Sequence, residues 1–207
     1  MEIAIASCAV WRADETAPKP DVSFISPMER RRLTGVERAA LSVAWKVRTE
    51  GEIPVVFASR WGEIGVTVKL MTQFHAEGEM SPAGFSASVH NAAPGAFSLL
   101  TGNRASYTAI AARERSLEAG LLETLALGCP AVFVFAEEAT PEFYAPEFGP
   151  PQGACALAAR LVPQAGGECR AEFRIAERPP VSFDDAAEFF EGRSGELAAA
   201  SFKIVRR

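Results

Sequence analysis

The feature that most constrains the fold is an apolar run in the second half of the chain, residues 131–136 (AVFVFA), which contains no polar side chain. A strand with one solvated face alternates apolar and polar residues, whereas a strand covered on both faces is apolar throughout. Gly128 precedes the run and is a typical helix stop, and the pair Glu137–Glu138 follows it. Residues 131–138 therefore predict a central strand in a sheet that carries helices on both faces.

Other strands and helices are expected to alternate along the chain. Leu117, Leu121 and Leu125 recur at helical spacing, and Ser26–Pro27 is a favourable helix start, with Gly35 expected to bend or split the helix that follows. Residues 154–162 (ACALAARLV) stay ambiguous, because alanine also favours helices. The expected strands are residues 3–10, 53–59, 106–110, 131–138, 154–162, 168–177 and 200–207. The expected helices lie within residues 27–47, 66–74, 94–101, 112–127 and 182–190.

This order of elements predicts an α/β layered fold with a mainly parallel sheet. We expect residues 1–163 to form the core in the order βαβαβαββ. Residues 164–207 are expected to add a strand–helix–strand extension to the same domain. Helix 66–74 is expected to present Val66, Leu70, Met71 and Phe74 on one apolar face.

The joint at residues 104–114 (RASYTAIAARE) reads as a buried strand running straight into a helix. Proteins often place a nucleophile at such a joint, because a helix N-terminus offers free N–H groups and positive partial charge. Here the joint carries Ala109, Ile110, Ala111 and Ala112, with no Cys, Ser or His among them.

Composition excludes several classes of protein. The net charge is −5 and no basic stripe stands out, which disfavours nucleic acid as a partner. The basic cluster at Glu29–Arg32 is either a solvated helix face or a docking patch for an acidic partner. No apolar run reaches the ~18 residues that a membrane span needs. The four cysteines form no CxxC pair, so we expect reduced thiols in a cytoplasmic protein, and neither a metal site nor a cofactor.

Standard catalytic motifs are missing from the sequence: it contains no GxGxxG, GxxxxGK[ST] or GxSxG. Of the two histidines, His75 reads as a solvated residue at a helix end. His90 lies among small residues and is interpreted either as a structural histidine bonded to nearby backbone or as part of a site. Glu137 and Glu138 are expected to point to opposite faces of their strand and to be solvated, not to act as an acid–base pair.

Several phrases, in their order and spacing, resemble one family. They are SPMERRRLTGVERAALSVA, VVFASRWGEIGVTVKLM, MSPAGFSASVHNAAPGAFSLLTGNRASYTAIAA and SLEAGLLETL, all within residues 1–163. The chain resembles the N-terminal half of β-ketoacyl synthases, of the thiolase-like fold. It is more similar still to short chain-length-factor-like proteins of bacterial aryl polyene, polyketide and fatty-acid gene clusters.

The resemblance implies a half-fold with a five-stranded mixed sheet, and a third strand, residues 106–110, that pairs with a second subunit. It also implies that Ile110 stands where active synthases carry their nucleophilic Cys. The second half of a synthase supplies two histidines, and the tail from 164 to 207 contains none. An aliphatic side chain cannot form a thioester. The resemblance therefore implies an inactive or accessory version of condensing machinery.

Three functional hypotheses follow. The first is a non-catalytic subunit that pairs with a β-ketoacyl synthase, an acyl carrier protein or both, as a homodimer or heterodimer through Ser106, Tyr107, Thr108, Ala109 and Ile110. The second is different acyl chemistry at an acyl pocket or site formed by His90, Asn91, Ser106 and Thr108. The third is a self-assembled structural or acyl-binding protein. In a full synthase, the C-terminal half covers one surface of the N-terminal half. We expect the tail or another chain to cover that surface here, because large exposed apolar patches are unfavourable.

Overall fold

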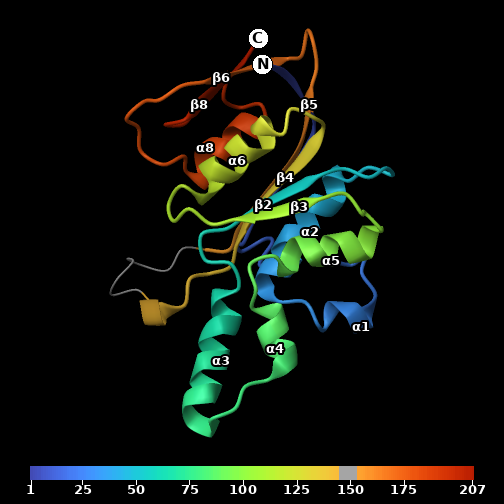
Figure 1. Cartoon of the computed structure of the whole chain (residues 1–207), viewed down its shortest axis with the longest axis vertical. Helices are drawn as coiled ribbons and strands as arrows, with labels where there is room; N and C mark the ends of the chain where they lie inside the picture. Colours follow the sequence, from blue (N-terminus) through green and yellow to red (C-terminus); the bar gives the residue numbers. More distant parts are fainter. Residues whose placement is uncertain (145–152) are drawn as a thin grey trace.

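The computed structural model describes residues 1–144 and 153–207, and within them eight strands form a single mixed sheet (Figure 1). The strand order across the sheet is β3-β2-β4-β5-β1-β6-β8-β7. The strands are β1 (Glu2–Arg12), β2 (Val55–Ala58), β3 (Tyr107–Ile110), β4 (Ala131–Glu137), β5 (Cys155–Pro163), β6 (Cys169–Phe173), β7 (Glu196–Ala198) and β8 (Phe202–Arg206). The helices are α1 (Pro27–Arg30), α2 (Gly35–Val47), α3 (Ile64–Glu77), α4 (Pro82–Ala87), α5 (Ala92–Thr101), α6 (Ser116–Ala126), α8 (Phe183–Phe190) and a 3₁₀ turn, Glu142–Tyr144.

The sheet is parallel only around β2, which pairs in parallel with β3 and with β4. Every other pairing in the described sheet is antiparallel, so the expectation of a mainly parallel sheet is wrong. The reason is that β5 lies between β4 and β1 and runs antiparallel to both. The five strands from β3 to β1 are the mixed unit that the resemblance implies, and the α/β fold class is confirmed.

The ambiguous alanine-rich segment is a strand, β5. It pairs along its length with β4 on one side and β1 on the other. Pairing on both edges satisfies its backbone groups, and this long-range context outweighs the helical preference of alanine. Small side chains at Ala156, Ala158 and Ala159 are fully buried beneath the helices that cover the sheet.

The C-terminal tail extends the same sheet. Strand β6 pairs with the first residues of β1, Glu2 opposite Arg170, and β8 and β7 follow outward. The tail contains one strand more than expected, β7, because residues 196–198 pair with β8.

A hydrophobic core lies on each face of the sheet, and the alternating side chains of β4 contribute to both. Val132 and Val134 pack against α2 and α5 on one face, whereas Phe133 and Phe135 pack with residues of α6 and α8 on the other. Helix α6 lies so close to the sheet that a β-carbon at Gly120 would come within 2.5 Å of that of Ala58. The apolar run therefore forms the buried middle of a layered structure, as its composition predicts.

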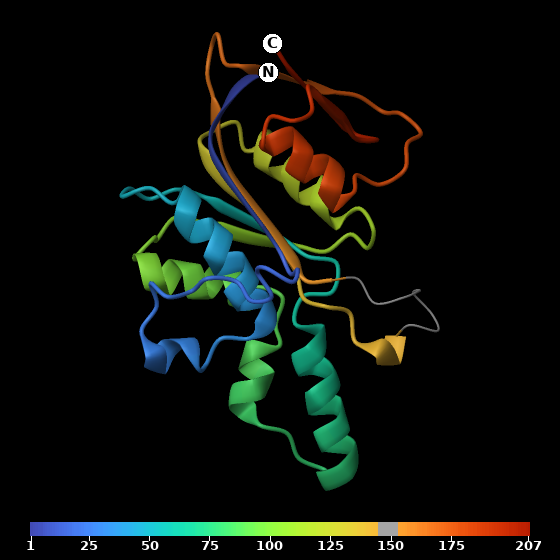
Figure 2. The ribbon, with the colours of Figure 1, turned by 180° about the vertical axis from the view of Figure 1, so that it is seen from behind.

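Helix α8 covers the face of the sheet on which α6 lies. It lies beside α6 (Figure 2) and begins with a capping box between Ser182 and Asp185. Its buried side chains are Ala186, Ala187, Phe189 and Phe190. The tail therefore covers this face of the sheet in the described chain.

The α2 segment starts as a separate helix, so Gly35 marks a split. The hydroxyl of Thr34 accepts the backbone N–H of Glu37, and the Glu37 carboxylate accepts the N–H of Thr34, which completes a capping box. Upstream, Ser26 caps the short α1 with Pro27 in its first turn, as expected.

Helices α3 and α4 form a hairpin that projects away from the sheet (Figures 1 and 2). The α3 helix is confirmed, but its apolar face is not buried as a whole. Leu70 is buried, whereas the side chains of Met71 and Phe74 are exposed. No helix in the described ranges is long and apolar enough to cross a membrane.

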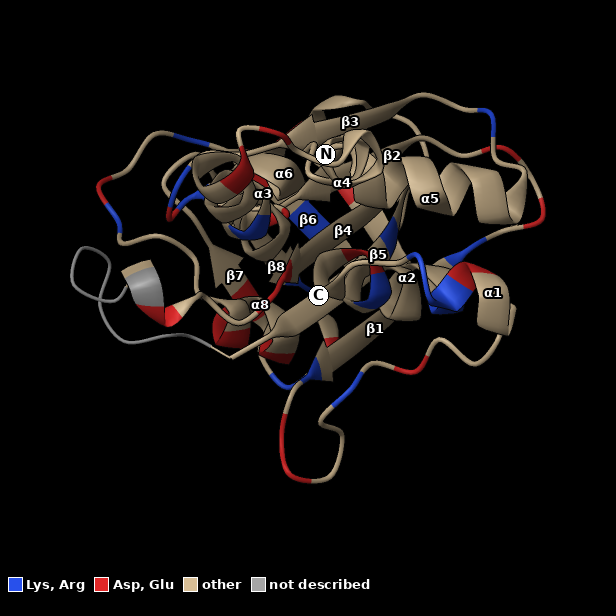
Figure 3. Cartoon of the chain, turned by 90° about the horizontal axis from the view of Figure 1, so that it is seen from below, with Lys and Arg blue, Asp and Glu red and all other residues tan. Residues whose placement is uncertain are grey.

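Charged side chains avoid one part of the surface. Residues 80–112 contain a single Lys, Arg, Asp or Glu, which is Arg104. This stretch forms α4, α5 and β3, and α5 and β3 accordingly carry no charged colour in Figure 3.

Candidate functional site

The joint after β3 is longer than the sequence suggests. Strand β3 ends at Ile110 and α6 starts only at Ser116. The Ser116 hydroxyl accepts the N–H of Ala112 at 2.9 Å and donates to the carbonyl of Arg113 at 2.7 Å. Arg113 has a φ of 52°, a left-handed conformation that non-glycine residues seldom adopt. This side-chain-held turn delays the helix, so the expected start near residue 112 is wrong.

Ile110 is partly buried at the end of an edge strand. Its carbonyl accepts the backbone N–H of Ser59 at 3.1 Å and lies 3.0 Å from Nε2 of His90. The position that the family resemblance assigns to a nucleophile thus holds an aliphatic side chain whose backbone is bonded into the sheet and the neighbouring loop.

His90 joins the end of β3 to the loop after β2. A β-carbon at Gly62, which has a φ of +54°, would stand 2.6 Å from Nδ1 of His90, so only glycine fits beneath the ring. The ring also contacts Phe57, with 5.6 Å between ring centroids. Nε2 of His90 contacts a backbone carbonyl. This agrees with the interpretation of His90 as a structural histidine bonded to nearby backbone.

The other expected site residues lie apart from His90. Ser106 precedes β3 while His90 contacts its far end, about 13 Å away at the usual rise per strand residue. Thr108 is exposed on the edge strand, and Asn91 is an exposed N-cap of α5 without a side-chain capping bond. His75 is exposed in the last turn of α3. The structure does not bring these side chains into one pocket.

Glu137 and Glu138 are only partly exposed and both carboxyl groups are hydrogen-bonded, so the expectation of a solvated strand end is wrong. They do point to opposite faces. Glu137 accepts the hydroxyl of Ser59 at 3.0 Å and the backbone N–H of Arg60, whereas Glu138 accepts the N–H of Gly65 at 2.6 Å. Burial raises the pKa of Glu137 to about 7 against these bonds, and raises that of Glu138 as well. Both carboxyl groups anchor the loop that follows β2.

A cavity of about 290 Å³ opens beside this anchor, at the carboxyl ends of β2, β3 and β4. Ligands of α/β proteins commonly bind at such an edge. The cavity has apolar walls, carboxyl and guanidinium groups at its rim, and residues from both core and tail. Its lining includes Arg60, Trp61, Arg113, Leu117, Phe135, Glu137, Cys155, Val181 and Phe183.

The cavity lacks an activated nucleophile among the described residues. Burial, with Glu137 nearby, raises the pKa of the Cys155 thiol to about 12, so it stays protonated at neutral pH. Ser116 and Ser182 use their hydroxyls within their own turns. Neither histidine lines the cavity. No group of three His, Cys, Asp or Glu in residues 1–144 and 153–207 has the geometry of a metal site.

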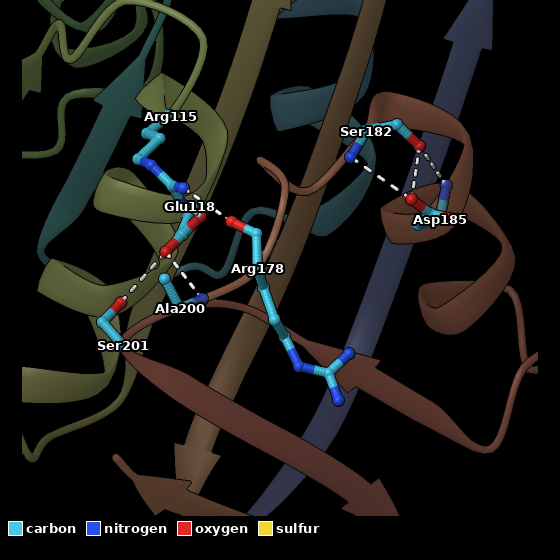
Figure 4. A network of polar contacts seen from close by, with 7 residues as sticks. All are labelled: Arg115, Glu118, Arg178, Ser182, Asp185, Ala200 and Ser201. Carbon is cyan, nitrogen blue, oxygen red and sulfur yellow. Dashed lines mark hydrogen bonds and ion pairs between the residues drawn. The ribbon is translucent and has the colours of Figure 1, made fainter. Parts of the chain in front are cut away.

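A buried carboxylate joins the tail to the core (Figure 4). Glu118 of α6 accepts an ion-paired N–H of Arg115 at 2.8 Å, the backbone N–H of Ala200 at 3.0 Å and the hydroxyl of Ser201 at 3.3 Å. Arg115 also donates to the carbonyl of Arg178 at 2.7 Å. This network fixes α6 to the tail on both sides of α8.

Sequence reasoning missed the polar group that surrounds the joint. Ser59, Arg60 and Glu63 follow β2 directly and gather with Glu137 and His90 at one edge of the sheet. Their signal was available, because polar residues at the carboxyl ends of neighbouring parallel strands meet in space. Glu118 gave no such signal, since its partners lie 82 and 83 positions away.

Solved structures with the same architecture are thiolase-like ketosynthases. A chain of the ketosynthase ApeO in complex with its chain length factor ApeC, from Xenorhabdus doucetiae, is similar over 100% of both chains, with a TM-score of 0.74 and 20% identity. A chain of a type II polyketide synthase complex, AntDE:AntF, matches 84% of this chain and 69% of its own length, with a TM-score of 0.61 and 12% identity. A β-ketoacyl synthase from Burkholderia phymatum gives a TM-score of 0.54 at 11% identity, over 85% of this chain and 65% of that one.

The fold is therefore the thiolase-like fold that these structures share. A family model for the β-ketoacyl synthase N-terminal domain matches residues 4–196. The chain belongs to this family, as the resemblance read from the sequence indicated. No curated protein matches the chain in sequence.

Proposed function

We propose that this protein is a non-catalytic, chain-length-factor-like partner of a condensing enzyme in bacterial aryl polyene, polyketide or fatty-acid biosynthesis. The observation that carries the proposal is Ile110 at the end of β3, in the nucleophile's position, with no activated thiol or hydroxyl in the adjacent cavity. Acyl transfer through a covalent intermediate needs a nucleophile and a base within reach of it. A chain without that pair would contribute to condensation by binding the condensing enzyme and shaping the acyl pocket.

The open edge of β3 is the proposed contact with the partner. The carbonyls of Ser106 and Ile110 face β2, where they accept the N–H groups of Val55 and Ser59. Successive residues of a strand turn their backbone groups to opposite edges, so those of Tyr107 and Ala109 face outward. In the described sheet no strand pairs with this edge. Unpaired edges are templates for another strand.

The surroundings of the edge also favour a protein partner. Leu99 on α5 is 88% exposed, and Phe85 and Val89 are exposed on and just after α4. The stretch from 80 to 112 carries only Arg104 as a charged residue. Depletion of charge and enrichment of large apolar side chains mark the centres of protein interfaces. Two of the similar structures are complexes, one of a ketosynthase with its chain length factor and one of a ketosynthase with an acyl carrier protein, which supports these partner classes.

The test is co-expression with the condensing enzyme and the carrier protein of the same gene cluster, followed by size-exclusion chromatography with light scattering. We expect a complex with the condensing enzyme in wild type. The variant Leu99→Asp should lose that complex, because a desolvated charge is placed in the interface. Ile175→Asp is the matched control: Ile175 is a fully exposed aliphatic residue of the tail, so its variant should still bind.

Complex formation by wild type that Leu99→Asp leaves unchanged would contradict the proposed interface. A chain that elutes as a dimer and binds neither protein would favour the self-assembled alternative. The site hypothesis around His90 predicts instead that His90→Ala abolishes pathway product while the complex survives.

A further inference from the structure

The loop between β2 and α3, residues 59–63, connects the sheet to the projecting α3–α4 hairpin, and carboxyl groups hold it. Glu137 bonds its first half through the Ser59 hydroxyl at 3.0 Å, the N–H of Arg60 and the N–H of Trp61 at 3.4 Å. Glu138 holds the first turn of α3 through the N–H of Gly65. A β-carbon at Gly65 would lie 2.9 Å from Oε1 of Glu138, so this carboxylate fits closely against the helix backbone.

Glu63 is the most confined of these groups. Its exposed fraction is 3%, and its Oε1 accepts the hydroxyl of Thr34 at 2.9 Å. Its Oε2 is buried without a hydrogen-bond partner among the described residues. An ionised carboxylate is poorly accommodated there, because a buried charge needs donors on both oxygens. A protonated carboxyl costs less free energy to bury, because it carries no charge.

The charges around Glu63 act in the same direction. Glu37 of α2 and Glu138 after β4 both repel its ionised form. The nearest basic group on α3, Lys69, lines the same open hollow as Glu138. Burial first, and these two carboxylates next, raise the pKa of Glu63 to about 8, despite the opposing bond from Thr34.

Beyond this loop the hairpin has few other anchors. Helix α3 buries only Leu70, which packs on Gly84 of α4, and α4 has no buried residue. At the base of the hairpin, His90 packs on Gly62, Arg60 pairs with Glu114 at 2.7 Å, and Trp61 stacks on Tyr144. We propose that the β2–α3 loop is a proton-dependent hinge: Glu63 holds it closed while protonated, and loss of that proton opens the loop and frees the α3–α4 hairpin.

The direction of the pH effect follows from linkage. When the loop is open and hydrated, Glu63 releases its proton near pH 4.5, whereas the closed form keeps it up to about pH 8. Closure is therefore fully favoured below about pH 4.5. It weakens by at most about tenfold per pH unit as pH rises from about 4.5 to about 8, and it levels off above about pH 8.

The test is hydrogen exchange of backbone amides in residues 64–89, measured on the full chain at pH 6, 7, 8 and 9 and corrected for intrinsic exchange rates. We expect protection of these amides to fall about tenfold or more between pH 6 and 9, while amides of β4 change little. Glu63→Gln keeps the size and a donor without the charge. It should make the fall in protection of residues 64–89 clearly smaller than in wild type, leaving only the part caused by Glu137 and Glu138, whose pKa values burial also raises.

Glu77→Gln, at the exposed end of α3, is the matched control and should follow wild type. Constant protection of the hairpin in wild type would overturn the proposal, as would a fall in Glu63→Gln equal to that in wild type. Should Glu63→Gln fail to fold, carbon-13 NMR of the Glu63 carboxyl in wild type decides. A titration midpoint above pH 6.5 supports the hinge and one below 5.5 refutes it.

Discussion

The two flanks of this sheet differ in how they are covered. On one face the tail folds back, and α8 packs beside α6 over Phe133 and Phe135. At the β3 edge, on the side of α5 and α4, the chain leaves backbone groups unpaired and apolar side chains in solvent. The first flank is thus completed from within the chain. The second flank consists almost entirely of uncharged residues, a composition that suits a contact surface. The difference separates a flank that the tail covers from a flank that stays open for the proposed partner.

The largest effect is expected from breaking the closed flank. Phe189 of α8 is fully buried and stacks edge-on against Phe190. Phe189→Ala should lower the free energy of unfolding by about 3–5 kcal/mol through lost burial and a cavity, measured by urea denaturation. Phe74→Ala, on the exposed hairpin, should change it by less than about 0.5 kcal/mol. Equal effects of the two variants would show that the flanks are not covered differently.

A smaller effect is expected at the contact that joins the tail to the core. Glu118→Ala removes the acceptor for Ala200 and Ser201 and leaves Arg115 without its ion-pair partner. The free energy of unfolding should fall by about 2 kcal/mol, because a buried donor loses its partner. Glu188→Ala, an exposed carboxylate on α8, should stay within about 0.5 kcal/mol of wild type in the same denaturation assay.

The smallest effect is expected from restoring a nucleophile on the open flank. Ile110→Cys places a thiol at the joint, but α8 and the rest of the tail contribute no histidine to it. The purified variant should therefore form no condensation product from malonyl and acyl thioesters, followed by mass spectrometry. Product formation by this variant alone would mean that the closed flank supplies catalytic groups, and the proposed accessory role would fail.

Local sequence patterns predicted the elements that are determined by residues close together in the sequence. The apolar run at 131–136, the leucine stack of α6 and the cap at Ser182 all correspond to the structure, since each depends on residues that are close in sequence. The strand identity of β5 was undecided, because it is determined by its two neighbours in the sheet and not by its alanines. For the same reason the continuation of the sheet into the tail was not foreseeable.

The candidate site was predicted only in part. The absence of a nucleophile at Ile110 could be predicted from the sequence, because it depends on the identity of one residue. The roles of Glu137 and Glu138 were wrongly predicted because their partners are backbone N–H groups of a loop more than 70 positions away. Backbone donors leave no trace in a pattern of side chains.

The position of β1 has a consequence for how the chain is made. Residues 2–12 are synthesised first, yet they pair with β5 and β6, which begin at residues 155 and 169. At translation rates of about 5–20 residues per second, roughly 8–30 s pass before either partner strand exists. Throughout that interval the first strand of the nascent polypeptide has no sheet to join. Because pairing of such distant segments also slows folding, the edges of this strand stay unpaired until most of the chain has been made.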